Sequence, residues 1–299
     1  MDIISIGDIN IDIITPVLDD MPERDRQRVI KDISMDVGGC SANFAYAASK
    51  LGADVRFIGK LGDDIFRDFI LERMQGVDMH VPSETKTGIT YAITFEDGTR
   101  SFITYPGSNA ELSIEDINFD LIEGRYVHVA SFFLQGLKKD TVNIFRNAHE
   151  KEMITSFDTG WDPFGWSSED IKVIKEVLRE GDIFFPNLDE AKKITKLDNK
   201  DEICDALLDS GPEIIGLKMG SNGSYIASQD ERLFIPPFEV TPVDTTGAGD
   251  VFNAAFIFGH HKGWDLERIG RFANTAAGLS VCGAGRENYP GLGEVVKFI

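Results

Sequence analysis

The segment from Asp244 to His261, DTTGAGDVFNAAFIFGHH, combines small residues, glycines and carboxylates at the junction between an extended segment and a helix. An extended segment is expected over Ile235 to Val243, and apolar residues recur at helical spacing from Asp250 onward. Such a turn directs several backbone N–H groups, and the positive end of the helix dipole, toward one point. Gly247 and Gly249 allow close approach of the backbone, so the turn suits an anion such as a phosphate.

Asp250 allows two interpretations. A carboxylate in the first turn of a helix can simply complement the helix dipole, and this explanation is favoured for an isolated Asp. Beside a turn that suits phosphate, the same carboxylate could accept the proton of a hydroxyl group that is being phosphorylated. Both interpretations are open on the local sequence alone.

The overall charge restricts the partners of this 299-residue chain. Thirty basic and 50 acidic residues give a net charge of −20. A surface of this charge repels nucleic acids and anionic membranes. It also repels a nucleotide triphosphate, so a nucleotide site would need local positive charge from amides, Lys, Arg or a divalent cation. We therefore expect a small-molecule substrate and neither a nucleic acid nor a membrane partner.

The cysteines and the N-terminus bear on the compartment. Cys40, Cys204 and Cys282 are far apart and lack the spacing of a metal site, which favours a reducing compartment without disulfides. The start, MDIISIGDIN, lacks the basic region of a signal peptide, and no run of 18 uncharged apolar residues occurs. We expect a cytoplasmic protein.

The first third of the chain contains two further polar motifs. In GDINID, Asp8, Asn10 and Asp12 alternate with Ile, and this pattern alone favours a solvent-facing strand. Gly38-Gly39 precede a helix that contains Asn43 in its first turn. The glycine pair is either a tight turn with Ser41 as helix N-cap or a place where a ligand approaches the backbone, and the two readings are equally weighted.

Three later motifs have ordinary structural explanations. The acidic pair that ends GKLGDD, residues 59–64, is expected to complement a helix dipole. Asn187 and Glu190 have the spacing of a capping box. Residues 218–224, KMGSNGS, are expected to form a hairpin turn.

The elements that must position these residues alternate regularly. Short apolar strands, expected at 3–6, 55–58, 126–130, 153–157, 182–185 and 213–218, are separated by helical segments, which is typical of a parallel sheet covered on both faces. A further strand is expected at 29–37. A hairpin from Thr87 to Tyr105, with its turn at Asp97-Gly98, stands outside this rhythm and is a candidate lid.

The motifs together resemble the PfkB (ribokinase-like) family of sugar and nucleoside kinases in order and approximate spacing, from about Ile3 to Pro290. The resemblance implies an α/β fold, namely a ribokinase-like three-layer α/β/α sandwich with a mostly parallel central sheet and a small β-sheet lid. It also implies a single kinase domain over residues 1–299, with the lid contributed by about 11–37 and 85–106.

The resemblance further implies an ATP-dependent transfer of the γ-phosphoryl group to a hydroxyl of a small sugar, polyol or nucleoside. Asp250 matches the general base of the family, with the anion hole formed by Gly247, Ala248 and Gly249. Residues that match the acceptor site are Asp12, Gly39 and Asn43. Residues that match the nucleotide site are Lys218, Gly220, Gly223, Asn274 and Ala277.

Metal ions are implied in the same way. Asn187 and Glu190 match residues that the family associates with Mg²⁺, through water. Asp244 and Thr246, with carbonyls near Ala284 and Gly285, resemble the monovalent-cation site of many members, which makes K⁺ an additional candidate cofactor.

Two departures from the family pattern and several alternatives remain. Cys40 stands where ribokinases have Lys, which disfavours ribose, and Arg67 stands where the family often has Gly. Aromatic residues of the hairpin, Tyr91, Phe102 and Tyr105, are candidates for stacking on a base or a sugar, so a nucleoside kinase is the alternative within the family. A homodimer through the lid is expected. A catalytically silent binding relative and a dinucleotide-binding dehydrogenase are disfavoured, the latter because Gly7 lacks the companion glycines of GxGxxG.

Overall fold

The computed structural model describes residues 1–96 and 99–299. Within these residues a nine-stranded sheet runs through the body in the order β15-β14-β13-β12-β11-β10-β1-β4-β6. It is parallel except for β14, which pairs antiparallel with both of its neighbours. Its strands are β1 Ile3–Ile6, β4 Val55–Ile58, β6 Val77–His80, β10 Tyr126–Val129, β11 Ile154–Phe157, β12 Ile183–Phe184, β13 Ile214–Lys218, β14 Ser224–Ser228 and β15 Arg232–Ile235.

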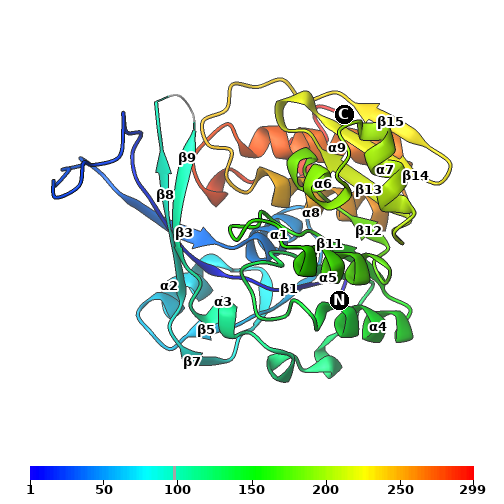
Figure 1. Cartoon of the computed structure of the whole chain (residues 1–299), viewed down its shortest axis with the longest axis horizontal. Coiled ribbons are helices and arrows are strands. Elements are labelled where there is room, and N and C mark those ends of the chain that lie inside the picture. The colour runs from blue at the N-terminus through cyan, green and yellow to red at the C-terminus, as the bar shows by residue number, and fades with distance from the viewer. Residues whose placement is uncertain (97–98) are drawn as a thin grey trace.

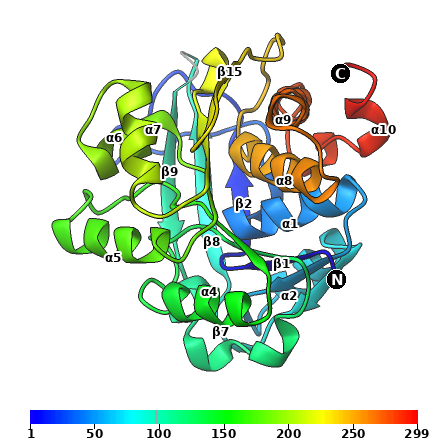
Figure 2. The ribbon, with the colours of Figure 1, turned by 90° about the vertical axis from the view of Figure 1, so that its right-hand side faces the viewer.

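Helices cover both faces of this sheet, as Figure 2 shows with the sheet seen between them. One side carries α1 Cys40–Lys50, α8 Ala248–His261 and α9 Leu266–Ser280, and the other carries α4 Thr141–Glu150, α5 Ser168–Leu178, α6 Leu188–Thr195 and α7 Lys200–Leu208. Each side has its own apolar core. Strands buried on both faces explain the continuous apolar runs of the sequence, and the expected three-layer architecture is confirmed.

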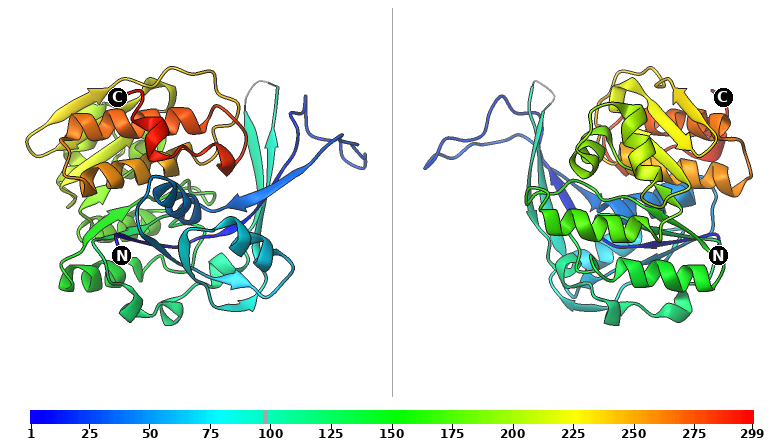
Figure 3. Two further views of the ribbon diagram at one scale, coloured as in Figure 1. Left: turned by 180° about the vertical axis from the view of Figure 1, so that it is seen from behind. Right: turned by 45° about the vertical axis from the view of Figure 1, so that its right-hand side comes forward.

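A second, smaller sheet stands at one end of the body (Figure 1). Its order is β3-β2-β8-β9, and its strands are β2 Asn10–Ile14, β3 Ser34–Gly38, β8 Gly88–Thr94 and β9 Arg100–Tyr105. Only residues 7–9 separate β1 from β2, so the chain passes directly from the large sheet into the small one. The segment between β2 and β3 extends away from the body beside this sheet (Figure 3). The expected hairpin is confirmed, and its turn at Asp97-Gly98 lies outside the described residues.

The register of the small sheet gives it two different faces. Asp12 pairs with Thr90, which pairs with Thr104, so these polar side chains share one face. Arg100 and Phe102 follow the same parity as Thr104 and lie on this face as well. The opposite face is apolar and carries Met35, Ile13, Tyr91, Ile103 and Tyr105.

The short elements complete the chain, and they lie mainly near the small sheet and the C-terminus. The strands are β5 Leu61–Gly62 and β7 Ser83–Thr85. The helices are α2 Phe66–Arg73, α3 Ser108–Glu111 and α10 Leu292–Val295, and the 3-10 turns are η1 Ile114–Asp116, η2 Phe119–Leu121, η3 Gly220–Asn222 and η4 Arg286–Asn288. Among the described helices, none combines the length and the apolar composition that a membrane crossing requires.

Asp64 fixes the base of the small sheet. Its carboxylate accepts hydrogen bonds from the amide (2.8 Å) and the hydroxyl (2.9 Å) of Thr87, the residue before β8. It also accepts from the amide of Phe66 at 3.1 Å, at the start of α2. Asp64 therefore lies at the start of a helix, as expected. It also anchors the hairpin formed by β8 and β9.

The expected strand at 29–37 is wrong in its extent, and the expected extended segment from Ile235 to Val243 does not pair as a strand beyond Ile235. The segment 29–37 forms a strand only from Ser34, and Val29 and Ile33 are exposed. Beyond β15, residues 236–243 form no strand, because Pro236, Pro237 and Pro242 have no N–H group to donate to a neighbouring strand. This irregular segment instead forms part of a cavity wall.

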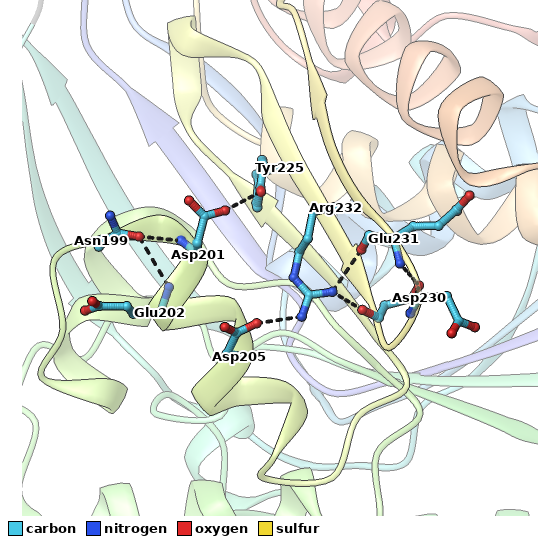
Figure 4. A network of polar contacts seen from close by, with 9 residues as sticks. Asn199, Asp201, Glu202, Asp205, Tyr225, Asp230, Glu231 and Arg232 are labelled. Atoms are coloured by element: carbon cyan, nitrogen blue, oxygen red, sulfur yellow. Dashed lines mark hydrogen bonds and ion pairs between the residues drawn. The ribbon is translucent and has the colours of Figure 1, made fainter.

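Polar contacts tie α7 to the antiparallel end of the large sheet (Figure 4). Arg232 of β15 contacts the carboxylate of Asp205 at 2.5 Å, and the hydroxyl of Tyr225 donates to Asp201. Asn199 caps α7 by accepting from the amides of Asp201 and Glu202. The hairpin formed by β13 and β14 is thereby held from its outer side.

Candidate active site

A cavity of about 770 Å³ opens where β11, β12 and β13 end and α8 begins. This is the carboxyl edge of the parallel strands, where α/β folds place their ligands. The predicted site residues that line it are Asn187, Glu190, Lys218, Gly220, Gly223, Ala248, Gly249, Asp250, Asn274 and Ala277. Those that do not line it are Asp12, Gly39, Asn43, Gly247, Asp244 and Thr246. The structure therefore brings together the predicted phosphate and nucleotide residues, and places the predicted acceptor residues beside this cavity.

The turn before α8 has the geometry of an anion hole. The helix begins at Ala248, two residues earlier than the sequence pattern indicates, with Gly247 at its N-cap in the left-handed conformation (φ 75°). A side chain at Gly247 would collide with the Tyr289 hydroxyl, so this position requires Gly. The amides of Gly249 and Asp250 make no backbone hydrogen bond among the described residues, and both residues line the cavity. Two donors at a helix start are therefore available to an anion.

Asp250 is buried in the cavity wall. Its carboxylate accepts a hydrogen bond from the side-chain amide of Asn43 at 3.0 Å, which connects α1 with α8. Burial raises the pKa of Asp250 well above its usual range, and the charge of Asp158 adds to the shift, whereas the Asn43 hydrogen bond opposes it. The carboxylate is thus a stronger base than a free Asp.

Asp8 contradicts the solvent-facing interpretation of GDINID. It is buried, and its carboxylate accepts the amides of Cys40 (3.1 Å) and Ser41 (2.9 Å) at the start of α1. The Ser41 hydroxyl donates to the carbonyl of Ile6 at 3.1 Å and does not cap the helix. Of the two readings of the glycine pair, the one with Ser41 as N-cap is therefore wrong, and Asp8 satisfies the helix amides instead.

Asp12 lies against the glycine pair. A side chain at Gly38 would overlap the Asp12 carboxylate, and the side-chain amide of Asn10 donates to that carboxylate at 2.6 Å. Burial raises the pKa of Asp12 to about 7, while the Asn10 hydrogen bond opposes this shift. The carboxylate of Asp12 is thus enclosed, although the residue as a whole is only partly buried. Gly38-Gly39 form a turn and also allow the Asp12 side chain to lie close to the backbone.

Asn187 and Glu190 form the capping box that their spacing predicts. The Asn187 side chain accepts from the Glu190 amide at 2.9 Å, and the Glu190 carboxylate accepts from the Asn187 amide at 2.8 Å. A bridge between Asn187 and Lys218 brings this motif beside the nucleotide loop. Burial, and then the charge of Asp158, raise the pKa of Glu190 to about 7. Buried oxygen ligands with surplus negative charge suit Mg²⁺ held through water.

Asp158 and Asn253 are site residues that sequence reasoning missed. Asp158 follows β11, and its carboxylate contacts the Lys218 ammonium at 2.5 Å and the Asn253 amide at 2.6 Å. Asn253 lies one turn after Asp250 on α8. The sequence did contain a signal for Asp158, since this polar residue directly follows the expected strand 153–157. Parallel strands end at one edge of the sheet, which is where ligands bind.

The nucleotide loop and α9 form the far wall. Gly223 adopts φ 84°, and a side chain there would overlap the carbonyl of Ile235. The side-chain amide of Asn274 donates to the carbonyls of Ile235 (3.1 Å) and Pro236 (2.8 Å), so it fixes the irregular segment after β15. Ala277 presents a small side chain to the cavity.

Arg100 reaches the turn from the small sheet. Its guanidinium donates to the Thr246 hydroxyl at 2.6 Å and lies 3.7 Å from the Asp244 carboxylate. The carbonyls of Ala284 and Gly285 accept from the Asn288 side chain at 2.5 and 3.4 Å. The ligands expected for a monovalent cation are therefore already engaged by protein donors, and this set does not fit the cation as it stands.

Comparison with known proteins gives this site its family. The model of the pfkB family carbohydrate kinases matches residues 1–290. The chain is 31% identical over 237 residues to an uncharacterized sugar kinase of Archaeoglobus fulgidus, which covers 77% of this chain and 92% of that one. It is 28% identical over 282 residues to 5-dehydro-2-deoxygluconokinase of Clostridium perfringens, covering 88% and 83%.

The fold agrees with solved structures. The structure of Arabidopsis thaliana ribokinase complexed with ribose and ATP superposes with a TM-score of 0.86 at 24% identity, covering 99% of this chain and 97% of that one. The chain belongs to the pfkB family carbohydrate kinases and has the ribokinase fold. It is accordingly a phosphotransferase that acts on an alcohol group.

The enclosed carboxylate of Asp12 leads to a pH-dependent stability prediction. Its folded pKa of about 7 lies above the ordinary value of 3.8, so its favourable contribution is present below pH 3.8 and is lost as the pH rises through about 7. Asp12→Asn should therefore raise the melting temperature more at about pH 8 than at about pH 5. Thermal unfolding of both proteins across this range measures the difference, and an equal shift at both pH values would contradict it.

Proposed function

We propose that this chain is an ATP-dependent kinase that transfers the γ-phosphoryl group to a hydroxyl of a small sugar or polyol, with Asp250 as the general base. One observation carries this proposal: a buried carboxylate and two unengaged amides at the start of α8 lie in the wall of the same cavity. The amides stabilise the charge of the migrating group, and the carboxylate accepts the proton of the attacking hydroxyl.

Asn43 aligns the base. Its amide donates to one oxygen of Asp250, which leaves the other oxygen for the acceptor hydroxyl. Burial raises the pKa of Asp250, so its carboxylate holds a proton more strongly than that of an exposed aspartate. Gly220 and Ala277 would flank ATP in this cavity, and the amides at Gly249 and Asp250 would bind its phosphates.

Magnesium supports the same step. Asn187 and Glu190 would hold Mg²⁺ through water, and the ion would supply positive charge that balances the phosphates. The surrounding carboxylates of Asp158 and Glu190 supply the negative environment that attracts it.

The small sheet serves as a lid, formed by residues 11–37 and 85–106 of a single kinase domain. Its polar face, with Asp12, Thr90 and Thr104, is turned toward the acceptor, since Arg100 of that face lines the cavity. Closure would exclude water from the reaction. Of the three aromatic residues considered for stacking, only Phe102 lies on this face, while Tyr91 and Tyr105 lie on the other. A nucleoside acceptor has Phe102 as its stacking partner and remains the second candidate.

The three unpaired cysteines accord with a reducing, ATP-rich compartment, so the cytoplasm is the proposed location.

Replacing the base should abolish turnover. Asp250→Asn keeps the shape and the partner of the side chain but removes its ability to accept a proton, so kcat should fall by roughly 10³-fold or more. A coupled assay of ATP consumption with sugars, sugar acids, polyols and nucleosides first identifies the acceptor and then measures the loss. Asp265→Asn, at the N-cap of α9, is the control and should keep its activity. Wild-type turnover by the Asp250 variant would refute the assignment.

The charge at Asp244 is balanced by the lid rather than by a monovalent cation. Because Arg100 already contacts Thr246 and Asp244, exchange of K⁺ for tetramethylammonium should change the wild-type kcat by less than about two-fold. Arg100→Ala opens a place for the cation, and its activity should then respond to K⁺. A strong K⁺ requirement of the wild type would contradict this prediction.

The apolar outer face of the lid should pair with a second copy of the chain. Ile103 (57% exposed), Tyr105, Tyr91 and Met35 form a continuous apolar surface next to the open edge of β9. Sedimentation should give twice the chain mass of 33.1 kDa. Ile103→Asp should weaken association by about 100-fold or more, because an unpaired buried carboxylate costs roughly 3 kcal/mol. Phe234→Asp, equally exposed on β15, should leave association unchanged; a wild-type monomer at micromolar concentration would remove the proposal.

A further inference from the structure

Asp158 is a buried carboxylate in the cavity wall, and the reaction proposed above gives it no contact with the reacting groups. One of its oxygens accepts from the Lys218 ammonium (2.5 Å) and from the Asn253 amide (2.6 Å). Its other oxygen accepts from the amide of Gly160 at 2.9 Å. Its own amide donates to the carbonyl of Val129 at 3.0 Å, which ties it to β10. Both oxygens are thus engaged, and the position of the carboxylate is fixed on several sides.

The partner of this carboxylate points toward the anion hole. An added β-carbon at Gly249 would lie 3.4 Å from the Lys218 ammonium, so this ammonium is adjacent to the first turn of α8. Lys218 and Arg100 are the cationic residues of the described cavity lining. Arg100 belongs to the lid, so only Lys218 supplies a positive charge from the rigid body of the fold.

The ammonium needs a fixed counter-charge at this place. The Lys218 side chain is only 14% exposed, and the Asp158 carboxylate lies 2.5 Å from its ammonium. A lysine is also a flexible chain with little directional preference of its own. Without Asp158, its ammonium could turn toward Glu190 or Asp250, both of which face the same cavity. The position of the charge therefore depends on the carboxylate that holds it.

Asn253 links this pair to the base. It lies three residues after Asp250 on α8, is fully buried, and uses its side-chain amide on Asp158. The contacts therefore join β11, β13 and α8 into one unit, which fixes the position of the Lys218 ammonium relative to the Asp250 carboxylate. Such preorganisation is what stabilisation of a charged transition state requires.

We propose that Asp158, held by Asn253, is a positioning residue that keeps the Lys218 ammonium against the anion hole, where it stabilises the charge of the migrating phosphoryl group. This inference rests on the proposed kinase function and names a residue that acts through Lys218 and not on the substrate. In this role both contacts of one Asp158 oxygen, with Lys218 and with Asn253, serve to hold the ammonium in place.

A double-mutant cycle tests this assignment with the full-length protein. Asp158→Asn should lower kcat by about 30-fold, and Lys218→Met by about 100-fold, as expected for the loss of an oriented transition-state donor. The double variant should be no slower than Lys218→Met, because Asp158 acts only through the lysine. Calorimetric titration with ATP should show a much smaller loss of affinity than of kcat in Asp158→Asn.

Asp162→Asn is the matched control. Asp162 is buried in the same loop and accepts from the amides of Phe164 and Trp166, but it makes no contact with Lys218. This variant should lose thermal stability while its kcat stays within about three-fold of wild type. Melting curves of all variants separate loss of fold from loss of positioning.

Three outcomes would overturn the inference. Asp158→Asn could retain wild-type kcat; the two single effects could multiply in the double variant; or Asp158→Asn could raise the Mg²⁺ concentration required for activity while Lys218→Met does not. The last result would make Asp158 a metal ligand. In each case the wild type would still turn over with ATP and an acceptor, so these outcomes are separate from a failure of the kinase function, in which the wild type is itself inactive.

Discussion

The concentration of negative charge in one cavity is the constraint on which this structure depends. Asp158, Glu190 and Asp250 are all buried in its wall, and Lys218 is the cation that the rigid body supplies there. Burial of an ionised carboxylate is costly unless hydrogen bonds or opposite charges compensate it. Each of the three has a fixed partner: the ammonium and an amide for Asp158, a backbone amide for Glu190, and Asn43 for Asp250. The remaining imbalance favours a divalent cation with its phosphates.

The fold supplies this compensation from segments that are far apart in the chain. The parallel strands end at one edge, so Asp158, Asn187 and Lys218 meet although about 30 residues separate each from the next. Within its first two turns, helix α8 adds Asp250, Asn253 and the glycine turn that precedes them. Helix α1 adds Asn43 across 207 positions of sequence. Elements that are far apart in the chain therefore hold the charged groups of this cavity in place.

The small sheet has two different surfaces. Alternation along its strands separates a polar face, which carries Asp12 and Arg100, from an apolar face, which carries Tyr91 and Ile103. Asp64 and Thr87 fix its base, whereas its far end contacts the body through Arg100. One strand set can thus serve the substrate on one side and a second subunit on the other.

The sequence by itself determined the strand and helix order, the glycine turn at residues 247–249, the capping box at Asn187 and Glu190, and the family, because these depend on local spacing and on backbone conformations that only certain residues adopt. It could not determine where Asp8 points, since alternation with Ile does not distinguish solvent from the start of another helix 32 residues later. Nor could it determine the Asp158–Lys218–Asn253 contacts or the reach of Arg100 to Thr246. These contacts depend on which strand ends and helix faces the fold brings together. The electrostatic interactions at such junctions depend on distances between residues of different segments, and these distances are set only by the tertiary structure.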